Sequence, residues 1–174
     1  MNRKKISLVL VFFLAFFLVG CTQKASNPKV DNWGKYQQQG TITIGFDNTF
    51  VPMGFEEKNG QYTGFDIDLI RAIGKRINKD VELKNVAFDA LIPALNTHDI
   101  DVAASGMTIT KARSEKVLFS SPYYENALAV VYKDGANITS LDDLKGKKIA
   151  AQLGTTGADL AHKIEGTTVK EFDH

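Results

Sequence analysis

The sequence predicts an α/β fold in two lobes, because short strand patterns alternate with amphipathic helix patterns along most of its 174 residues. Apolar runs of strand length recur at 41–46, 81–86 and 100–104, and helical periodicity fills the gaps between them. The same alternation starts again after residue 128, which predicts a second lobe. Strands that are separated by helices pair in parallel, so we expect a parallel sheet.

The first predicted strand is 41–46, where isoleucine and phenylalanine alternate with polar or small residues. A short helix is expected before it over 33–39, ended by Gly40. An aromatic, proline-containing loop follows at 50–55, and Lys58-Asn59-Gly60 has the chemistry of a hairpin turn.

Two helices are predicted between the strands of the first lobe. The helix over 66–78 has an apolar face formed by Ile70, Ile73 and Ile77. The helix over 88–96 lies between the predicted strands 81–86 and 100–104. Its inward residues are expected to be Leu91, Ala94 and Leu95.

The second lobe is predicted to contain a strand at 128–133 and another at 147–152. Ser140 begins a capping-box pattern for a short helix between them, and 154–157 opens a further helix over 158–164. After residue 128 there is room for two or three strands, which is marginal for an independent hydrophobic core. We therefore expect this lobe either to pack on something else or to belong to a fragment.

Composition excludes several classes of protein. The chain is 44% hydrophobic and 24% charged, as in ordinary globular domains, and its net charge of +1 includes three basic residues at positions 3–5. It has no basic stripe, so nucleic acid is not an expected partner. One cysteine and three scattered histidines give no disulfide framework and no metal-binding spacing, and we expect no cofactor.

The N-terminus predicts export and lipid anchoring. Basic residues 3–5 precede an apolar run over 6–19, which is short for a bilayer-spanning helix of about 20 residues. An uncleaved membrane anchor with an incidental cysteine is the alternative. Leu18-Val19-Gly20-Cys21 resembles a bacterial lipobox, which implies a signal peptide over 1–20 and diacylation of Cys21. A polar tether would then extend over 21–40, and the protein would be anchored to the extracytoplasmic face of the cell membrane.

The segment 105–113 follows the predicted strand 100–104 and combines a glycine, a helix start and an arginine. Thr110 occupies a helix N-cap position, which places Arg113 in the first turn, where a cation is mildly unfavourable. Two interpretations remain open on these residues alone. Arg113 is either solvated at an ordinary helix start or forms part of a cradle for a carboxylate.

Several short motifs in order resemble the polar-amino-acid solute-binding proteins of ABC importers, bacterial solute-binding family 3. The resemblance extends from about Thr41 to Gly157, and it implies the two-lobe fold of type II periplasmic binding proteins. Lobe 1 would span 41–127, with its first hinge strand at 123–127, and 128–174 would be a partial lobe 2. The motifs are Gly64-Phe-Asp-Ile-Asp-Leu69, Leu91-Ile-Pro-Ala-Leu95, Asp99-Ile-Asp-Val102, Ser105-Gly-Met-Thr-Ile-Thr110 with Arg113, Phe119-Ser-Ser-Pro-Tyr-Tyr124, and Leu144-Lys-Gly-Lys-Lys148 before Gly154-Thr-Thr156.

The resemblance implies an amino-acid site at the carboxyl ends of the strands. Arg113 would hold the ligand α-carboxylate bidentately, helped by the backbone N–H groups of Thr108 and Thr156. Carbonyl or hydroxyl oxygens of Ser105 and Gly106 would accept hydrogen bonds from the α-ammonium. Family members supply an acidic residue for this ammonium from a later segment, and no residue here fills that role.

Three further residues are implied for the ligand side chain, each with an alternative. Phe50 and Phe88 would stack on it, although Phe88 is also a candidate core residue. Asp47 would contact its polar end, or would simply cap a turn. Asp66 and Asp68 lie in the first turn of a predicted helix, where acidic residues usually interact with the helix dipole.

We therefore expect a lipid-anchored substrate-binding protein that delivers glutamine, arginine, lysine, histidine or a similar amino acid to an ABC permease and its ATPase. An enzyme of the same fold, such as a cyclohexadienyl (prephenate or arogenate) dehydratase, is one alternative. It is disfavoured because the histidines lie outside the strand-end segments. A sensor ectodomain and a C-terminally truncated gene product that binds nothing are the others.

Overall fold

The computed structural model describes residues 33–173, so the predicted signal peptide and the lipidation at Cys21 lie outside the described part. From Lys35 onward these residues form one compact unit. Helix α2 (Trp33–Gln38) precedes the first strand and ends one residue before the position predicted from Gly40. Within the described range, no helix has both the length and the apolar character needed to cross a membrane.

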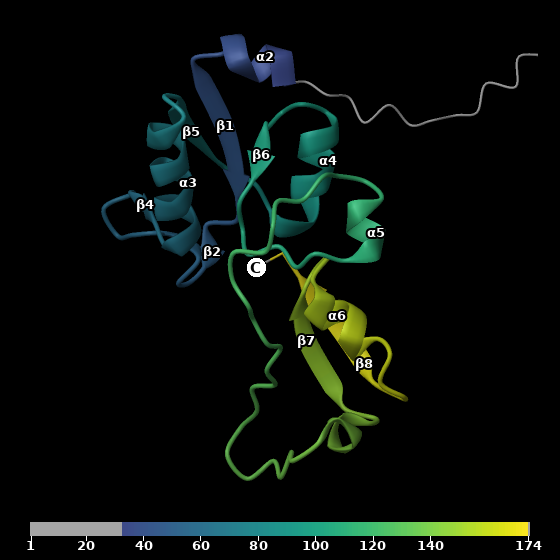
Figure 1. Cartoon of the computed structure of the whole chain (residues 1–174). Coiled ribbons are helices and arrows are strands. Elements are labelled where there is room, and N and C mark those ends of the chain that lie inside the picture. Colours follow the sequence, from purple (N-terminus) through teal and green to yellow (C-terminus); the bar gives the residue numbers. More distant parts are fainter. Residues whose placement is uncertain (1–32, 174) are drawn as a thin grey trace, which may run out of the picture. The chain divides into compact units, whose positions relative to one another are not determined.

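The principal sheet has three parallel strands in the order β5-β1-β6, as the alternation of strands and helices predicted (Figure 1). Strand β1 (Thr41–Phe46) is central, β5 (Asp80–Asn85) pairs along its whole length, and β6 (Val102–Ala103) pairs at its carboxyl end. The strand expected over 100–104 is thus shorter than predicted.

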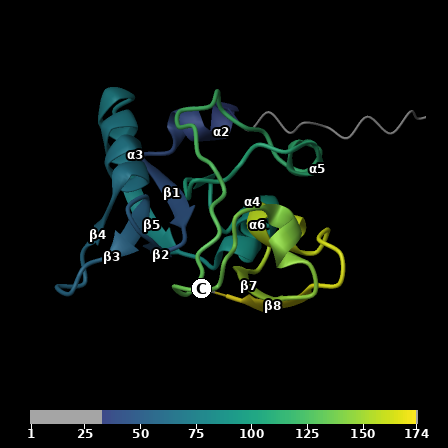
Figure 2. The same ribbon diagram turned by 90° about the horizontal axis from the view of Figure 1, so that it is seen from below.

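Two helical connections join these strands. Helix α3 (Phe65–Arg76) lies between β1 and β5, and the 3₁₀ turn η1 (Phe88–Ala90) with α4 (Leu91–Asn96) lies between β5 and β6. Because β5 and β6 lie on opposite sides of β1, right-handed connections place α3 and α4 on opposite faces of the sheet. Figures 1 and 2 show this arrangement, with α3 against β5 and α4 against β1 and β6.

The hydrophobic core beside the principal sheet lies under α4. Leu91 and Ile100 are 0% and 1% exposed and pack with Phe88. Ala94 and Leu95 pack against the same cluster, which confirms the predicted inward face of this helix. At about 25 cal/mol per Å² of apolar surface, burial of each large side chain contributes roughly 2 kcal/mol.

The predicted apolar face of α3 is wrong in part. Ile73 and Ile77 are 44% and 46% exposed, whereas Asp66, Ile67 and Gly74 are buried. Gly74 lacks a Cβ that would stand 2.5 Å from the Val81 side chain, so the helix approaches β5 along its glycine side. Periodicity of apolar residues does not detect a contact surface formed by glycine.

The connection between β1 and α3 contains a small antiparallel sheet, β2 (Thr49–Phe50), β3 (Gly54–Glu56) and β4 (Tyr62–Thr63). The turn between β3 and β4 has Gly60 at φ 79°, a left-handed conformation that favours glycine. This confirms the hairpin predicted from Lys58-Asn59-Gly60. Part of the predicted aromatic loop is therefore strand.

After residue 140, the capping box of Ser140 and Asp143 begins η2 (Leu141–Leu144), as predicted. Strands β7 (Lys148–Gln152) and β8 (Thr168–Phe172) pair in parallel across α6 (Thr156–Ala161). Helix α6 starts two residues earlier than the predicted helix over 158–164, because Thr155 provides its N-cap, and it ends at Ala161.

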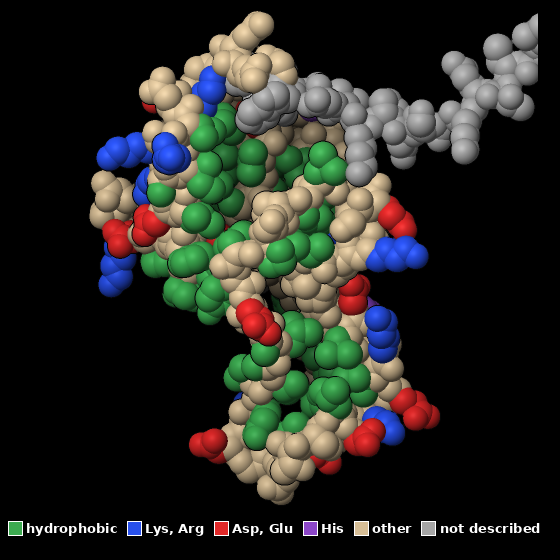
Figure 3. Space-filling view, viewed as in Figure 1, with side chains coloured by type: hydrophobic (Ala, Val, Ile, Leu, Met, Phe, Trp, Pro, Cys, Tyr) green, Lys and Arg blue, Asp and Glu red, His purple; other side chains and the backbone are tan. Residues whose placement is uncertain are grey.

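The predicted strands at 123–127 and 128–133 are wrong, since these residues have no regular structure. A strand needs a partner for its backbone groups, and no strand among residues 33–173 pairs with this segment. Apolar side chains here are correspondingly open, and Val131 is 95% exposed. Figure 3 shows hydrophobic side chains gathered over this segment and β7, around an apolar hollow lined by Leu128, Val130, Tyr132, Ile149 and Leu160.

Candidate functional site

The site lies where β1 and β6 end, because parallel strands bring their carboxyl ends to one edge. Asp47 follows β1 and Ser105 follows β6 by two residues. The backbone N–H of Asp47 donates to the Ser105 hydroxyl at 3.1 Å, and both residues are buried. The Ser105 hydroxyl therefore links the ends of β1 and β6 within the protein.

Asp47 is only 3% exposed, and both oxygens of its carboxylate accept hydrogen bonds. One oxygen accepts from the backbone N–H and hydroxyl of Thr49 at 2.9 and 2.6 Å. The other accepts from the Gln152 side-chain amide at 2.5 Å. Asp47 thus caps the turn after β1, the alternative considered for it, while its second oxygen already bonds an amide donor from the end of β7.

Gly106 has φ 56°, and a Cβ at this position would stand 2.7 Å from the Phe50 ring. Its backbone N–H donates to the Asp66 carboxylate at 2.6 Å. The glycine is therefore needed both for its left-handed backbone and for the close approach of Phe50.

Arg113 lies in the first turn of α5 (Lys111–Ser114), and the Thr110 hydroxyl accepts from the Arg113 backbone N–H at 3.2 Å, as predicted for an N-cap. Its guanidinium donates to the carbonyl oxygens of Thr108 at 2.7 Å and Gly154 at 2.9 Å. It also lies 5.4 Å above the Phe88 ring. Neither interpretation from the sequence describes this fully, because the arginine is half-buried and bonds two neutral oxygens.

Burial lowers the pKa of Arg113, and the charge of Asp159 opposes this shift. Because the ordinary pKa of an arginine lies far above neutrality, the guanidinium stays protonated at neutral pH. The site therefore holds a permanent positive charge whose present acceptors carry none. A carboxylate forms stronger, charge-assisted bonds with the same donors.

Phe88 is 8% exposed and belongs to the core cluster, which agrees with the core alternative considered for it. One face of its ring also lies beneath the Arg113 guanidinium. Thr156 is the first residue of α6, and its backbone N–H has no acceptor within that helix.

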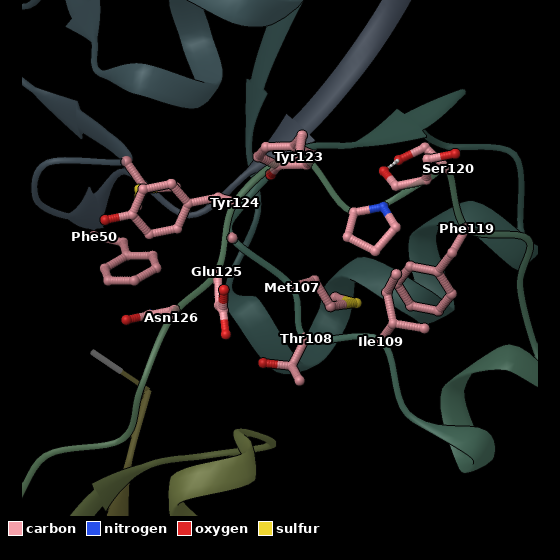
Figure 4. A pocket seen from close by; sticks show the side chains of 14 residues that line it. Phe50, Met107, Thr108, Ile109, Phe119, Ser120, Tyr123, Tyr124, Glu125 and Asn126 are labelled. Carbon is pink, nitrogen blue, oxygen red and sulfur yellow. Dashed lines mark hydrogen bonds between the residues drawn. The ribbon is translucent and has the colours of Figure 1, made fainter.

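A cavity of about 280 Å³ lies beside Gly106 and Thr108 (Figure 4). One wall is the segment 106–109, the other is 119–126, and Phe50 and Met53 contribute from the hairpin side. In Figure 4 the Phe50 and Tyr124 rings lie at one end and Phe119 at the other.

The structure brings together some of the predicted site residues and not others. Those that line the cavity are Phe50, Gly106 and Thr108. Arg113 reaches the cavity wall through the Thr108 carbonyl. The predicted residues outside the lining are Asp47, Ser105, Phe88, Arg113 and Thr156. Within residues 33–173, no group of three or more histidine, cysteine or acidic side chains could hold a metal ion.

Two residues of this neighbourhood were missed by the sequence reasoning. Gln152 contacts Asp47 across 105 residues of sequence, and no local sequence pattern predicts that contact. Asp66 was interpreted as a first-turn acid serving the helix dipole, but it is fully buried.

Comparison with known proteins gives consistent results. Residues 42–171 match the family model described as bacterial extracellular solute-binding proteins, family 3. The chain is 32% identical over 165 residues to the Bacillus subtilis (strain 168) protein named "Probable ABC transporter extracellular-binding protein YckB", an alignment that covers 90% of this chain and 58% of that protein.

Two solved structures are also similar. The arginine-bound Gly52Ala mutant of ArgBP from T. maritima has a TM-score of 0.77 at 36% identity, covering 80% of this chain and 67% of that one. The ancestral amino acid-binding protein AncCDT-1, titled a precursor of cyclohexadienyl dehydratase, has a TM-score of 0.73 at 39% identity, covering 81% and 64%. The fold is thus the type II periplasmic-binding-protein α/β fold. The chain spans about half the length of the curated relatives it matches.

Proposed function

The chain belongs to the bacterial extracellular solute-binding proteins of family 3, and from that premise we propose that it binds a free polar amino acid outside the cytoplasm as the substrate-binding component of an ABC importer. The observation that carries this proposal is the Arg113 guanidinium. It is half-buried, permanently charged and bonded to two neutral carbonyl oxygens, one of which belongs to Thr108 in the cavity wall.

Arg113 is assigned the ligand α-carboxylate. Its two donor nitrogens bond the Thr108 and Gly154 carbonyls at 2.7 and 2.9 Å, so the guanidinium is already oriented in a fork. A carboxylate is a stronger acceptor than either carbonyl and matches the fork bidentately. The backbone N–H groups of Thr108 and Thr156 are the proposed additional donors to this carboxylate.

The remaining contacts follow from the chemistry of a zwitterion. Oxygens of Ser105 and Gly106 are assigned to the α-ammonium, with the Ser105 carbonyl favoured because its hydroxyl already bonds Asp47. Phe50 supplies an apolar wall for the ligand, and the Phe88 ring supports the Arg113 guanidinium from beneath.

The ligand side chain is proposed to carry a hydrogen-bond donor. The Asp47 carboxylate now accepts from the Gln152 amide at 2.5 Å, so this position accommodates an N–H donor. A ligand such as glutamine, arginine, lysine or histidine would present an equivalent donor there. The solved relative from T. maritima is bound to arginine.

Membrane anchoring and delivery form the second part of the proposal. Diacylation of Cys21 would hold the protein at the extracytoplasmic face of the membrane, since two acyl chains give stable anchoring where one gives only marginal binding. Ligand would then pass to the permease and its ATPase. In cells labelled with palmitate, label should appear in the wild-type chain and be absent from Cys21→Ala, and equal labelling of both would reject the anchor.

Binding itself is tested by thermal unfolding of the full chain with a panel of the twenty amino acids. A polar amino acid should raise the melting temperature, because a ligand that binds only the folded state stabilises it. Arg113→Ala should lose this shift, whereas Arg76→Ala, which removes an exposed arginine of α3, should keep it. A panel without any shift would reject the proposal.

An enzyme on the same fold is not favoured by the described residues. The curated relatives are named as binding proteins. The buried titratable groups near the cavity, Asp47 and Asp66, are both engaged by hydrogen bonds to protein donors. If the protein converted prephenate or arogenate and bound no amino acid, the enzyme would be favoured over the binding protein.

A further inference from the structure

Asp66 is a fully buried carboxylate that neither the helix-dipole interpretation nor the proposed ligand contacts account for. It lies in the first turn of α3, yet its neighbour in that turn, Asp68, is exposed, with 74% of its side chain accessible. Among residues 33–173, no lysine or arginine forms an ion pair with Asp66. A buried carboxylate without a cation persists only where other donors satisfy its oxygens.

Both oxygens of Asp66 have such donors, and both donors belong to the cavity. One oxygen accepts from the backbone N–H of Gly106 at 2.6 Å, 40 residues away in sequence. The other accepts from the Tyr123 hydroxyl at 2.8 Å, 57 residues away. Gly106 is in one wall of the cavity and Tyr123 is in the other.

Neighbouring aromatic contacts hold the second of these walls, the one that contains Tyr123. The Tyr123 ring stacks on Phe65 with centroids 6.1 Å apart and planes at 20°, and Tyr124 lies 5.8 Å from the same ring. The first turn of α3 therefore holds the segment 123–124 by one hydrogen bond and two aromatic contacts. This segment has no strand pairing, so these contacts with α3 constrain it most directly.

We propose that Asp66 is a positioning residue of the amino-acid site, whose single carboxylate sets the separation of the two cavity walls by holding the Gly106 amide on one and the Tyr123 hydroxyl on the other. The inference rests on the proposed function and adds to it. Asp66 touches no ligand. Asp66 acts by holding Gly106 in the left-handed conformation that leaves room for the Phe50 ring. It also holds residues 123–124 beside the first turn of α3.

The two acceptor oxygens explain why an aspartate occupies this position. Asparagine offers one oxygen and an N–H₂ group, so it can still accept from Gly106 and donate to the Tyr123 oxygen, while one N–H remains unpaired. Alanine leaves both donors unsatisfied. The order of effects is therefore Asp66→Ala larger than Asp66→Asn, with Tyr123→Phe removing one arm of the bridge.

The test compares these variants with matched controls in the full chain. Asp68→Asn removes a charge from the same helical turn, and Tyr132→Phe removes a hydroxyl from a half-exposed tyrosine that lies outside the lining of this cavity. Affinity for glutamine and arginine is measured by calorimetry, and the Gly106 amide proton is followed by NMR. A short bond to a carboxylate places that proton downfield.

Asp66→Asn and Tyr123→Phe should each weaken amino-acid binding by about tenfold. The first variant makes both hydrogen bonds neutral and leaves one N–H unpaired, and the second removes one charge-assisted bond. Asp66→Asn should also move the Gly106 amide proton upfield, and both controls should match the wild type. Binding in Asp66→Asn equal to that in Asp68→Asn would overturn the positioning role.

The two proposals fail in different ways. If the wild-type chain binds none of the twenty amino acids, the proposed function fails, and the NMR arm alone decides the role of Asp66. In that case an unchanged Gly106 amide in Asp66→Asn overturns the bridge, and an upfield shift that Asp66→Asn shows and Asp68→Asn lacks supports it.

Discussion

Gly106→Ala tests the close packing of the cavity wall. Gly106 has φ 56°, and placing a residue with a Cβ in this left-handed region costs roughly 1–2 kcal/mol. The new Cβ would stand 2.7 Å from Cε1 of Phe50, so the ring must move. Overpacking of this kind costs about 1–3 kcal/mol, and the half-exposed Phe50 favours the lower end. We expect a loss of about 2–3 kcal/mol in unfolding free energy.

The assay is urea unfolding of the full chain, followed by far-UV circular dichroism, with the midpoint and slope compared between variants. Gly135→Ala is the matched control, because Gly135 has φ 81° and nothing within 4 Å of its would-be Cβ. It should show the backbone cost alone. If Gly106→Ala is no more destabilising than Gly135→Ala, Phe50 does not pack closely against Gly106 in this cavity wall.

Three further predictions concern stability. Ser105→Ala should lower the unfolding free energy by about 1–3 kcal/mol in urea titration, because it leaves the buried N–H of Asp47 without an acceptor. Leu91→Ala should cost about 2–5 kcal/mol by the same measurement, since its side chain is fully buried in the core. Hydrogen bonds from residues 139 and 140 lower the pKa of Asp143 from 3.8 to about 2, so its contribution to stability is present above pH 3.8 and is lost as the pH falls through 2. The wild type should therefore lose more stability than Asp143→Asn when circular dichroism melts are compared at pH 4 and pH 2.

The sheet of lobe 1 was predictable because each of its elements carries its own local pattern. Strands β1 and β5 alternate or run apolar, α4 has Leu91 and Leu95 at helical spacing, and the glycine turn at 58–60 has few other solutions. Parallel pairing then follows from the intervening helices.

Predictions failed where structure depends on residues distant in sequence. The segment 123–133 has the composition of a strand, but strand formation needs a partner that local patterns do not reveal. The face of α3 was misplaced because Gly74, which has no side chain, makes the closest approach to β5.

The candidate site was predictable only in part for the same reason. The position of Arg113 after its N-cap Thr110 followed from spacing and is observed. Its carbonyl acceptor at Gly154 and the pairing of Asp47 with Gln152 are contacts across 41 and 105 residues, which spacing does not encode. The motif resemblance supplied the residues, and the structure supplied their partners.

Calorimetric titration of the full chain with glutamine and arginine, in the wild type, Arg113→Ala and Arg76→Ala, tests the central claim most directly. Losing the guanidinium leaves the ligand carboxylate poorly paired at a cost of about 2–5 kcal/mol. We predict that the wild type and Arg76→Ala bind alike, and that Arg113→Ala binds at least about thirtyfold more weakly. Equal affinity in Arg113→Ala, or no heat with either amino acid in the wild type, would contradict this claim.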